Sequence, residues 1–395
     1  MKRRFPWVLL LCSIAPLASA ADPAPAGEAP RDAALPERAI QELARAWLAD
    51  NDGVGLSIGI YDNGRRHFFN IGATQLDGNT VPTKDTVYEI GALGKTMTGQ
   101  LLARAVVEGR VTLDDEVTRY LDGNYKNLAN GGEVIRLRHL AGMTSQLADN
   151  IPDITQVRKV PSEPLAVTRM RVFSEYSQKE FLRQLQRVAP RRPPGEEPGQ
   201  SNVSSLLLGV VLEKIYGEPF EVILAREIEK PLRMGSGTRP SAKLLAHGYT
   251  EDNEPLPPYG APSHYAANSL RYSAEDMLRF ASWQLVERDA SVKLAHQPLW
   301  STPDGRVSVG FYWIAGQSPQ DPQLGRRLQF SGTTFGFTSY CELYPEARIA
   351  VVLLSNKQAE GAQESLRALS GKITALARPG FVSPSSSTGA RQPDR

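Results

Sequence analysis

The sequence predicts an α+β fold in which one antiparallel sheet is built from both ends of the chain and is flanked by helices. Strand-like runs occur between residues 56 and 71 and again near the C-terminus, whereas helical patterns dominate the stretch between them. Strands separated in this way must pair across the two termini to form a single sheet. At 395 residues with 41% hydrophobic content, the chain is long enough for two domains or for one domain with a large insertion.

The first predicted elements are a helix and a β-hairpin. The helix is expected from Pro36, because apolar residues recur at helical spacing along one face. These residues are Ile40, Leu43, Ala44, Trp47 and Leu48. Strand-like runs follow at 56–61 and 67–71, and Asp62-Asn63-Gly64 between them is typical of a tight hairpin turn.

The middle of the chain is predicted to be mostly helical, and its end to return to strands. Helical patterns run over 95–109 and, strongly apolar, over 204–215. A final helix is expected at 364–377. The aromatic cluster Phe311-Tyr312-Trp313 is interpreted as strand core rather than a ligand platform. The predicted C-terminal strands are 307–314, 327–331, 337–344 and 349–354.

Both ends of the chain are predicted to lie outside the folded domain. Residues 1–20 combine a basic head, a short apolar run and a small-residue cleavage site, which is typical of a secretory signal peptide. An uncleaved anchor is the disfavoured alternative, since the run is too short to span a bilayer comfortably. Residues 21–35 are interpreted as a flexible lead and residues 377–395 as a disordered tail. We therefore expect a periplasmic protein with no transmembrane segment after signal removal.

Charge and composition argue against several kinds of function. Signal removal takes away three basic residues, so 45 Lys and Arg become 42 against 43 Asp and Glu, and the formal charge changes from +2 to −1. A nearly neutral chain argues against nucleic acid or an anionic membrane as a partner. The five His residues show no metal-ligand spacing, so neither a metal nor another cofactor is expected. Cys341 alone remains after residue 20, which leaves no intramolecular disulfide.

The stretch Tyr88 to Thr98 has the outline of a catalytic motif. It reads Tyr-Glu-Ile-Gly-Ala-Leu-Gly-Lys-Thr-Met-Thr and runs into the first long helical pattern. With its flanks it resembles the Ser-x-x-Lys element of the penicillin-recognising serine hydrolases, which include class C β-lactamases, DD-carboxypeptidases and related esterases. The resemblance implies a Ser that attacks a carbonyl and a Lys, one turn later, that helps to remove its proton. The Lys is Lys95, but Ala92 stands in place of the Ser, and no other Lys has a Ser three positions earlier.

Two further motifs of that family have altered counterparts. The family's Tyr-x-Asn falls at Gln200-Ser201-Asn202, where the Asn is retained and Gln200 replaces the Tyr. The resemblance implies that this Tyr exchanges protons during the reaction, which an amide cannot do. The family's Lys/His-Thr/Ser-Gly falls at Phe330-Ser331-Gly332, so Phe330 replaces a cation that would attract a substrate carboxylate.

The resemblance covers residues 36–376 and implies a β-lactamase/transpeptidase-like α/β sandwich. Its sheet part comprises residues 36–95 and 281–376, and its mostly helical subdomain is inserted at 96–280. The resemblance also places the oxyanion hole at the backbone N–H groups of Ala92 and Thr333. Backbone donors do not depend on side-chain type, so a carbonyl could be bound without being attacked.

Three altered motifs together indicate a naturally degenerate site with no intact catalytic residue. A single Ser-to-Ala change made to silence an enzyme would leave Gln200 and Phe330 unexplained. Lys95 is interpreted as a buried ammonium held by neighbours such as Asn202, in preference to a surviving base or cation in the cleft. Asn202 is expected either to bind a ligand amide or only to satisfy Lys95 and a loop carbonyl. The predicted ligand-binding residues are Ala92, Lys95, Asn202, Ser331, Gly332 and Thr333.

The resulting hypothesis is an exported pseudoenzyme that binds a peptidoglycan-derived peptide or an envelope protein. The alternative is an active serine hydrolase with a displaced nucleophile such as Ser201 or Ser331. A protein-interaction module with a closed cleft is the third hypothesis.

Overall fold

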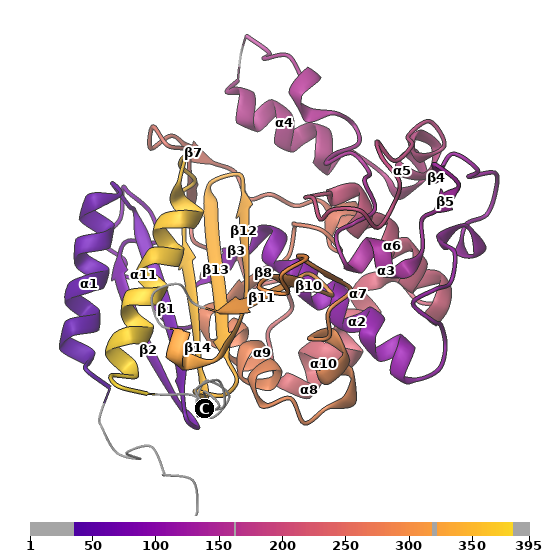
Figure 1. The fold of residues 1–395 in the computed structure, drawn as a ribbon. Helices are drawn as coiled ribbons and strands as arrows, with labels where there is room; N and C mark the ends of the chain where they lie inside the picture. The colour runs from indigo at the N-terminus through magenta and orange to yellow at the C-terminus, as the bar shows by residue number, and fades with distance from the viewer. Residues whose placement is uncertain (1–34, 162, 318–321, 382–395) are drawn as a thin grey trace, which may run out of the picture. The chain divides into compact units, whose positions relative to one another are not determined.

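The structure, a computed structural model, describes residues 35–161, 163–317 and 322–381 (Figure 1). All of them belong to one compact unit. The predicted signal peptide at 1–20 lies outside the described residues, as do the lead up to residue 34 and the tail from residue 382. No helix within the described ranges is long and apolar enough to cross a membrane.

An eight-stranded antiparallel sheet has the strand order β2-β1-β14-β13-β12-β11-β10-β9. The two ends of the chain meet where β1 pairs with β14, so that Ile58 lies opposite Leu353. The predicted sheet from both termini is therefore confirmed. Its strands are β1 (Gly55–Asp62), β2 (Arg65–Gly72), β9 (Trp300–Ser301), β10 (Ser308–Gly310), β11 (Trp313–Gln317), β12 (Arg326–Thr334), β13 (Phe337–Tyr344) and β14 (Ile349–Ser355).

The first and last helices, α1 (Glu37–Asp50) and α11 (Ala362–Ala377), cover one face of this sheet (Figure 1). Ile40 of α1 and Ile373 of α11 are fully buried in one apolar cluster with Ile58 of β1. Successive side chains of a strand point to opposite faces, so each strand supplies this cluster with every second residue. The N-terminal helix thus packs beside the C-terminal one, as the sheet pairing requires.

The opposite face packs against α9 (Ala274–Val286), α2 (Lys95–Val107) and the helices joined to them, in the larger apolar cluster. The predicted helices at 95–109, 204–215 and 364–377 are confirmed as α2, α6 (Asn202–Tyr216) and α11. The remaining α-helices are α3 (Leu137–Ala141), α4 (Leu165–Ser174), α5 (Gln178–Leu185), α7 (Phe220–Leu224), α8 (Lys230–Leu232) and α10 (Ala290–Ala295). The short strands are β3 (Val87–Glu89), β4 (Ala129–Asn130), β5 (Glu133–Val134), β6 (Gly248–Tyr249), β7 (Pro255–Leu256) and β8 (Arg271–Ser273).

The prediction of a single strand at 307–314 is wrong, because the structure has a hairpin there. β10 ends at Gly310, β11 begins at Trp313, and Phe311 and Tyr312 between them have φ values of 49° and 73°. Two left-handed residues form the tight turn whose twist suits antiparallel strands. Such a turn usually contains Gly or Asn, whereas aromatic residues favour strands. The turn therefore could not be predicted from the sequence. All three aromatic side chains of the cluster are buried, which confirms them as core.

Candidate functional site

The first motif and the third motif meet through backbone contacts. The short helix η1 (Gly91–Gly94) carries Ala92 and lies directly before α2. Gly91 has φ +56°, and a Cβ on it would lie 2.7 Å from both the nitrogen and the oxygen of Thr333. A Cβ on Gly332 would lie 2.0 Å from the carbonyl oxygen of Ile90. Only glycine permits this approach at either position, and it brings η1, which carries Ala92, against the backbone of Thr333.

Lys95 lies one turn beyond Ala92 and is 1% exposed. Its Nζ donates to Gln200 Oε1 at 3.5 Å and to the carbonyl oxygen of Ser201 at 3.4 Å. Both bonds are long for a charged donor. Burial lowers the pKa of Lys95 to about 8, while the nearby Asp149 carboxylate opposes that shift. The structure therefore brings Lys95 and Gln200 together, and it leaves the ammonium group weakly paired.

The hydrogen bonds of the second motif differ from those expected. Asn202 Nδ2 donates to Asn150 Oδ1 at 2.9 Å, and no bond joins Asn202 to Lys95 among the described residues. Ser201 is the N-cap of α6, since its Oγ accepts the N–H of Ser204 at 3.0 Å. The same hydroxyl donates to the Ala148 carbonyl at 2.8 Å. A carbonyl cannot take up that proton, so this position does not activate Ser201 as a nucleophile.

Phe330 of the third motif fills apolar space instead of offering a charge. Its side chain is 2% exposed, and its ring lies 6.4 Å from that of Tyr312, edge to face. The Tyr312 hydroxyl bonds Ser205 Oγ at 3.1 Å. Ser205 in turn donates to the Ser201 carbonyl at 3.4 Å, the same oxygen that receives Lys95. The sequence did not indicate these contacts, because Tyr312 was expected in a strand rather than in a hairpin turn, and nothing in the helical pattern of α6 marks Ser205 as its partner.

The side chains of Ser331 and Thr333 project from the face of β12 that is opposite η1. Thr333 Oγ1 accepts a hydrogen bond from Gln363 of α11 at 2.7 Å, and alternation along the strand puts Ser331 on the same side. Gly332 faces η1 instead. The hydroxyl of Ser331 therefore points away from Lys95, which argues against it as a displaced nucleophile.

One edge of β12 is open along the third motif. Its pairing with β11 ends where Gln329 lies opposite Ile314, whereas its pairing with β13 continues to Thr334. The backbone from Phe330 onward thus has a strand neighbour on one side only. Around this edge Ala92 and Thr333 are half-buried and Gln200 is exposed. No group of three or more potential metal-binding side chains occurs within the described part of the chain.

Comparison with known proteins agrees with this arrangement. A family model described as "Beta-lactamase" matches residues 38–375. A β-lactamase of Pseudomonas fluorescens is 23% identical over 360 residues, which cover 82% of this chain and 94% of the relative. The predicted family resemblance is confirmed.

Solved structures support the fold. A class C β-lactamase mutant superposes with a TM-score of 0.72 at 19% sequence identity, covering 86% of this chain and 96% of that one. A β-lactamase/D-alanine carboxypeptidase from Yersinia pestis, complexed with citrate, gives a TM-score of 0.69 at 20% identity and covers 86% and 99% of the two chains. At these identities the likeness shows the fold, and the predicted β-lactamase-like architecture is confirmed.

Proposed function

Because the chain belongs to the β-lactamase family, we propose that it is an exported, periplasmic pseudoenzyme that binds a cell-wall peptide without cleaving it. The neighbours of Lys95 carry the proposal. A methyl group at Ala92 and an amide at Gln200 occupy the positions of the family's nucleophile and its proton-exchanging hydroxyl. Neither group can form an acyl bond or transfer a proton near neutral pH.

The third altered position supports the same conclusion. Phe330 contributes a buried ring that contacts Tyr312, where the family has a cation. A substrate carboxylate would lose its charge-assisted partner there. Recovery of catalysis would thus need a nucleophile, an acid-base group and a cation together.

A carbonyl-bearing ligand still has donors available. The N–H of Ala92 lies in the first turn of a helix, where backbone donors lack partners within the helix. The backbone of Thr333 lies directly beside it. The buried Lys95 adds a positive charge on the same side. A peptide ending in D-alanine is the proposed ligand, because one structural relative is described as a D-alanine carboxypeptidase.

Calorimetric titration with an acylated tripeptide that ends in D-alanyl-D-alanine tests this function. We expect saturable binding and no release of free D-alanine. Ala92→Leu should weaken binding about tenfold or more, since the larger side chain fills the space beside the two backbone donors. Ala290→Leu, an exposed position at the start of α10, is the matched control and should bind as the wild type does.

Two results would contradict the proposal in different ways. Release of D-alanine would show an active hydrolase. Absence of binding, or equal binding by the wild type and the Ala92→Leu variant, would show that this site does not hold the peptide.

A further inference from the structure

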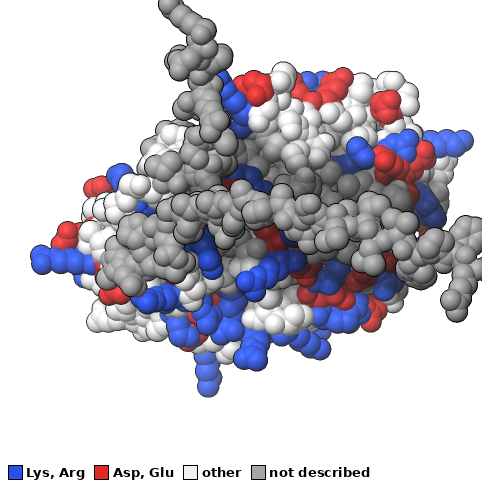
Figure 2. Space-filling view, turned by 60° about the horizontal axis from the view of Figure 1, so that its bottom comes forward, with Lys and Arg blue, Asp and Glu red and all other residues white. Residues whose placement is uncertain are grey.

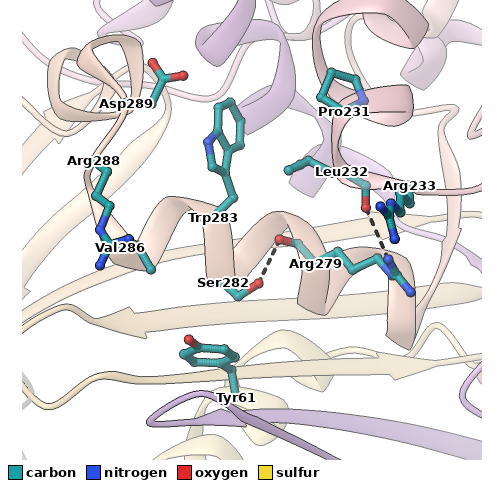
Figure 3. A pocket seen from close by; sticks show the side chains of 10 residues that line it. All are labelled: Tyr61, Pro231, Leu232, Arg233, Arg279, Ser282, Trp283, Val286, Arg288 and Asp289. Atoms are coloured by element: carbon teal, nitrogen blue, oxygen red, sulfur yellow. Dashed lines mark hydrogen bonds between the residues drawn. The ribbon is translucent and has the colours of Figure 1, made fainter.

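A second hollow, sharing no residue with the site around Lys95, lies between α8 and α9. Its volume is about 570 Å³. Figure 3 shows Trp283 projecting from α9 into the hollow, with Arg233 and Arg279 on one side of the indole and Arg288 and Asp289 on the other. The hollow thus combines an aromatic surface with three guanidinium groups and one carboxylate.

The carboxylate is already fully engaged. Asp289 is the N-cap of α10, where its Oδ1 accepts the N–H and the hydroxyl of Ser291. Its Oδ2 accepts Arg104 Nη2 at 3.1 Å. Asp289 therefore neutralises Arg104, outside the hollow, and not the arginines that line it.

The guanidinium groups are left in excess. Arg279 donates through Nε and Nη2 to Glu275 Oε1, but the same oxygen also receives Arg66 Nη1 at 2.7 Å. Arg233 and Arg288 are exposed, and neither has a side-chain hydrogen bond or ion pair to another described residue. The indole N–H of half-buried Trp283 likewise has no partner among the described residues. The charged groups of the hollow that lack a described partner are therefore both guanidinium groups, and the indole N–H is a further free donor, while the Tyr61 hydroxyl can donate or accept.

Such a hollow suits one class of ligand. A guanidinium group matches the planar, two-oxygen edge of a carboxylate, sulfonate or phosphate. The flat face of a tryptophan accepts an apolar or aromatic body. Figure 2, in which the lower side of Figure 1 comes forward, shows Lys and Arg side chains gathered along its lower border.

We propose that the hollow between α8 and α9 binds an organic anion, with its apolar body on Trp283 and its acidic group on one of the two free arginines that flank the indole, Arg233 or Arg288. The site is independent of the proposed peptide binding, because it shares no residue with it.

Calorimetric titration of the mature chain with 1-anilinonaphthalene-8-sulfonate, an aromatic anion, tests the site. The double variant Arg233→Gln/Arg288→Gln should bind this probe with an affinity at least about tenfold lower than that of the wild type, because it loses charge-assisted hydrogen bonds. The double variant Arg45→Gln/Arg158→Gln is the control, because it makes the same change of charge at exposed arginines elsewhere in the chain that have no described partner. The control should retain the wild-type affinity. Equal affinity in the wild type and the first variant, or an equal loss in both variants, would overturn the proposal.

Two further probes distinguish the source of the anion. Displacement of the sulfonate by octyl phosphate below its micellar concentration supports a free organic anion. Cosedimentation with phosphatidylglycerol vesicles that is lost in the Arg233→Gln/Arg288→Gln variant supports a lipid head group. Failure of both probes would overturn the proposal.

Discussion

At the scale of single residues, Lys95 is a buried cation without the nucleophile that the family's lysine activates. It is 1% exposed and has two long hydrogen bonds, to Gln200 and to the Ser201 carbonyl. Replacing such a group with an apolar side chain of similar length is often neutral or stabilising. We therefore expect the Lys95→Met variant to unfold with a free energy equal to that of the wild type or up to about 3 kcal/mol higher at neutral pH.

The pH dependence of stability gives a second prediction for Lys95. Burial lowers its folded-state pKa from 10.5 to about 8, so between these values the unfolded chain holds a proton that the folded chain has released. The free energy of unfolding contributed by Lys95 should then rise with pH across this window, by at most about 1.4 kcal/mol per pH unit. Denaturant unfolding at several pH values should show the wild type gaining stability relative to the Lys95→Met variant. A constant difference would mean that the pKa of Lys95 is not lowered.

Repair of the site tests whether all three motifs are degenerate. Ala92→Ser alone should give no more ester or penicillin hydrolysis than the wild type, because Gln200 still cannot exchange a proton. Adding Gln200→Tyr and Phe330→His should recover measurable turnover. Vigorous hydrolysis by the single variant would show that Gln200 and Phe330 do not prevent catalysis.

At the scale of elements, the site depends on the close approach of η1 and β12. A Cβ on Gly332 would lie 2.0 Å from the Ile90 oxygen and 2.7 Å from the Leu93 nitrogen, both of them backbone atoms that cannot easily move. Gly332→Ala should lower the free energy of unfolding by about 2 kcal/mol or more. Gly260→Ala is the matched control, since a Cβ there meets nothing within 4 Å. Equal denaturation midpoints for the two variants would show that the contact is not tight.

The sequence predicted most elements but not how their side chains pair. The three motifs indicated which backbones would meet, and Gly91 and Gly332 do lie against β12 and η1 respectively. The partner of Asn202 could not be predicted, because Asn150 reaches it from a loop without a regular pattern. The contact of Tyr312 with Ser205 could not be predicted for a related reason. Its position depends on a turn made by two aromatic residues, where local propensity favours a strand.

At the scale of the whole molecule, the fold needs both ends of the chain. Helices α1 and α11 share one apolar cluster with β1 and β14, although these segments come from opposite ends of the sequence. A chain that ends at Gly361 loses α11 and exposes the outer face of β13 and β14. We expect it to show no cooperative unfolding transition, whereas a chain that ends at Phe381 and keeps α11 serves as the reference. A cooperative transition with equal denaturant dependence in both chains would contradict this role for α11.

We propose that this chain retains the fold of a serine hydrolase without its acyl-transfer chemistry. The most direct test is the intact mass of the mature protein after incubation with a reactive penicillin and, separately, with an activated ester. We predict no covalent adduct, because Ala92 cannot be acylated, the Ser201 proton is held by the Ala148 carbonyl and Ser331 faces away from Lys95. A stable mass increase that maps to one Ser or Thr would contradict this proposal and identify a relocated nucleophile.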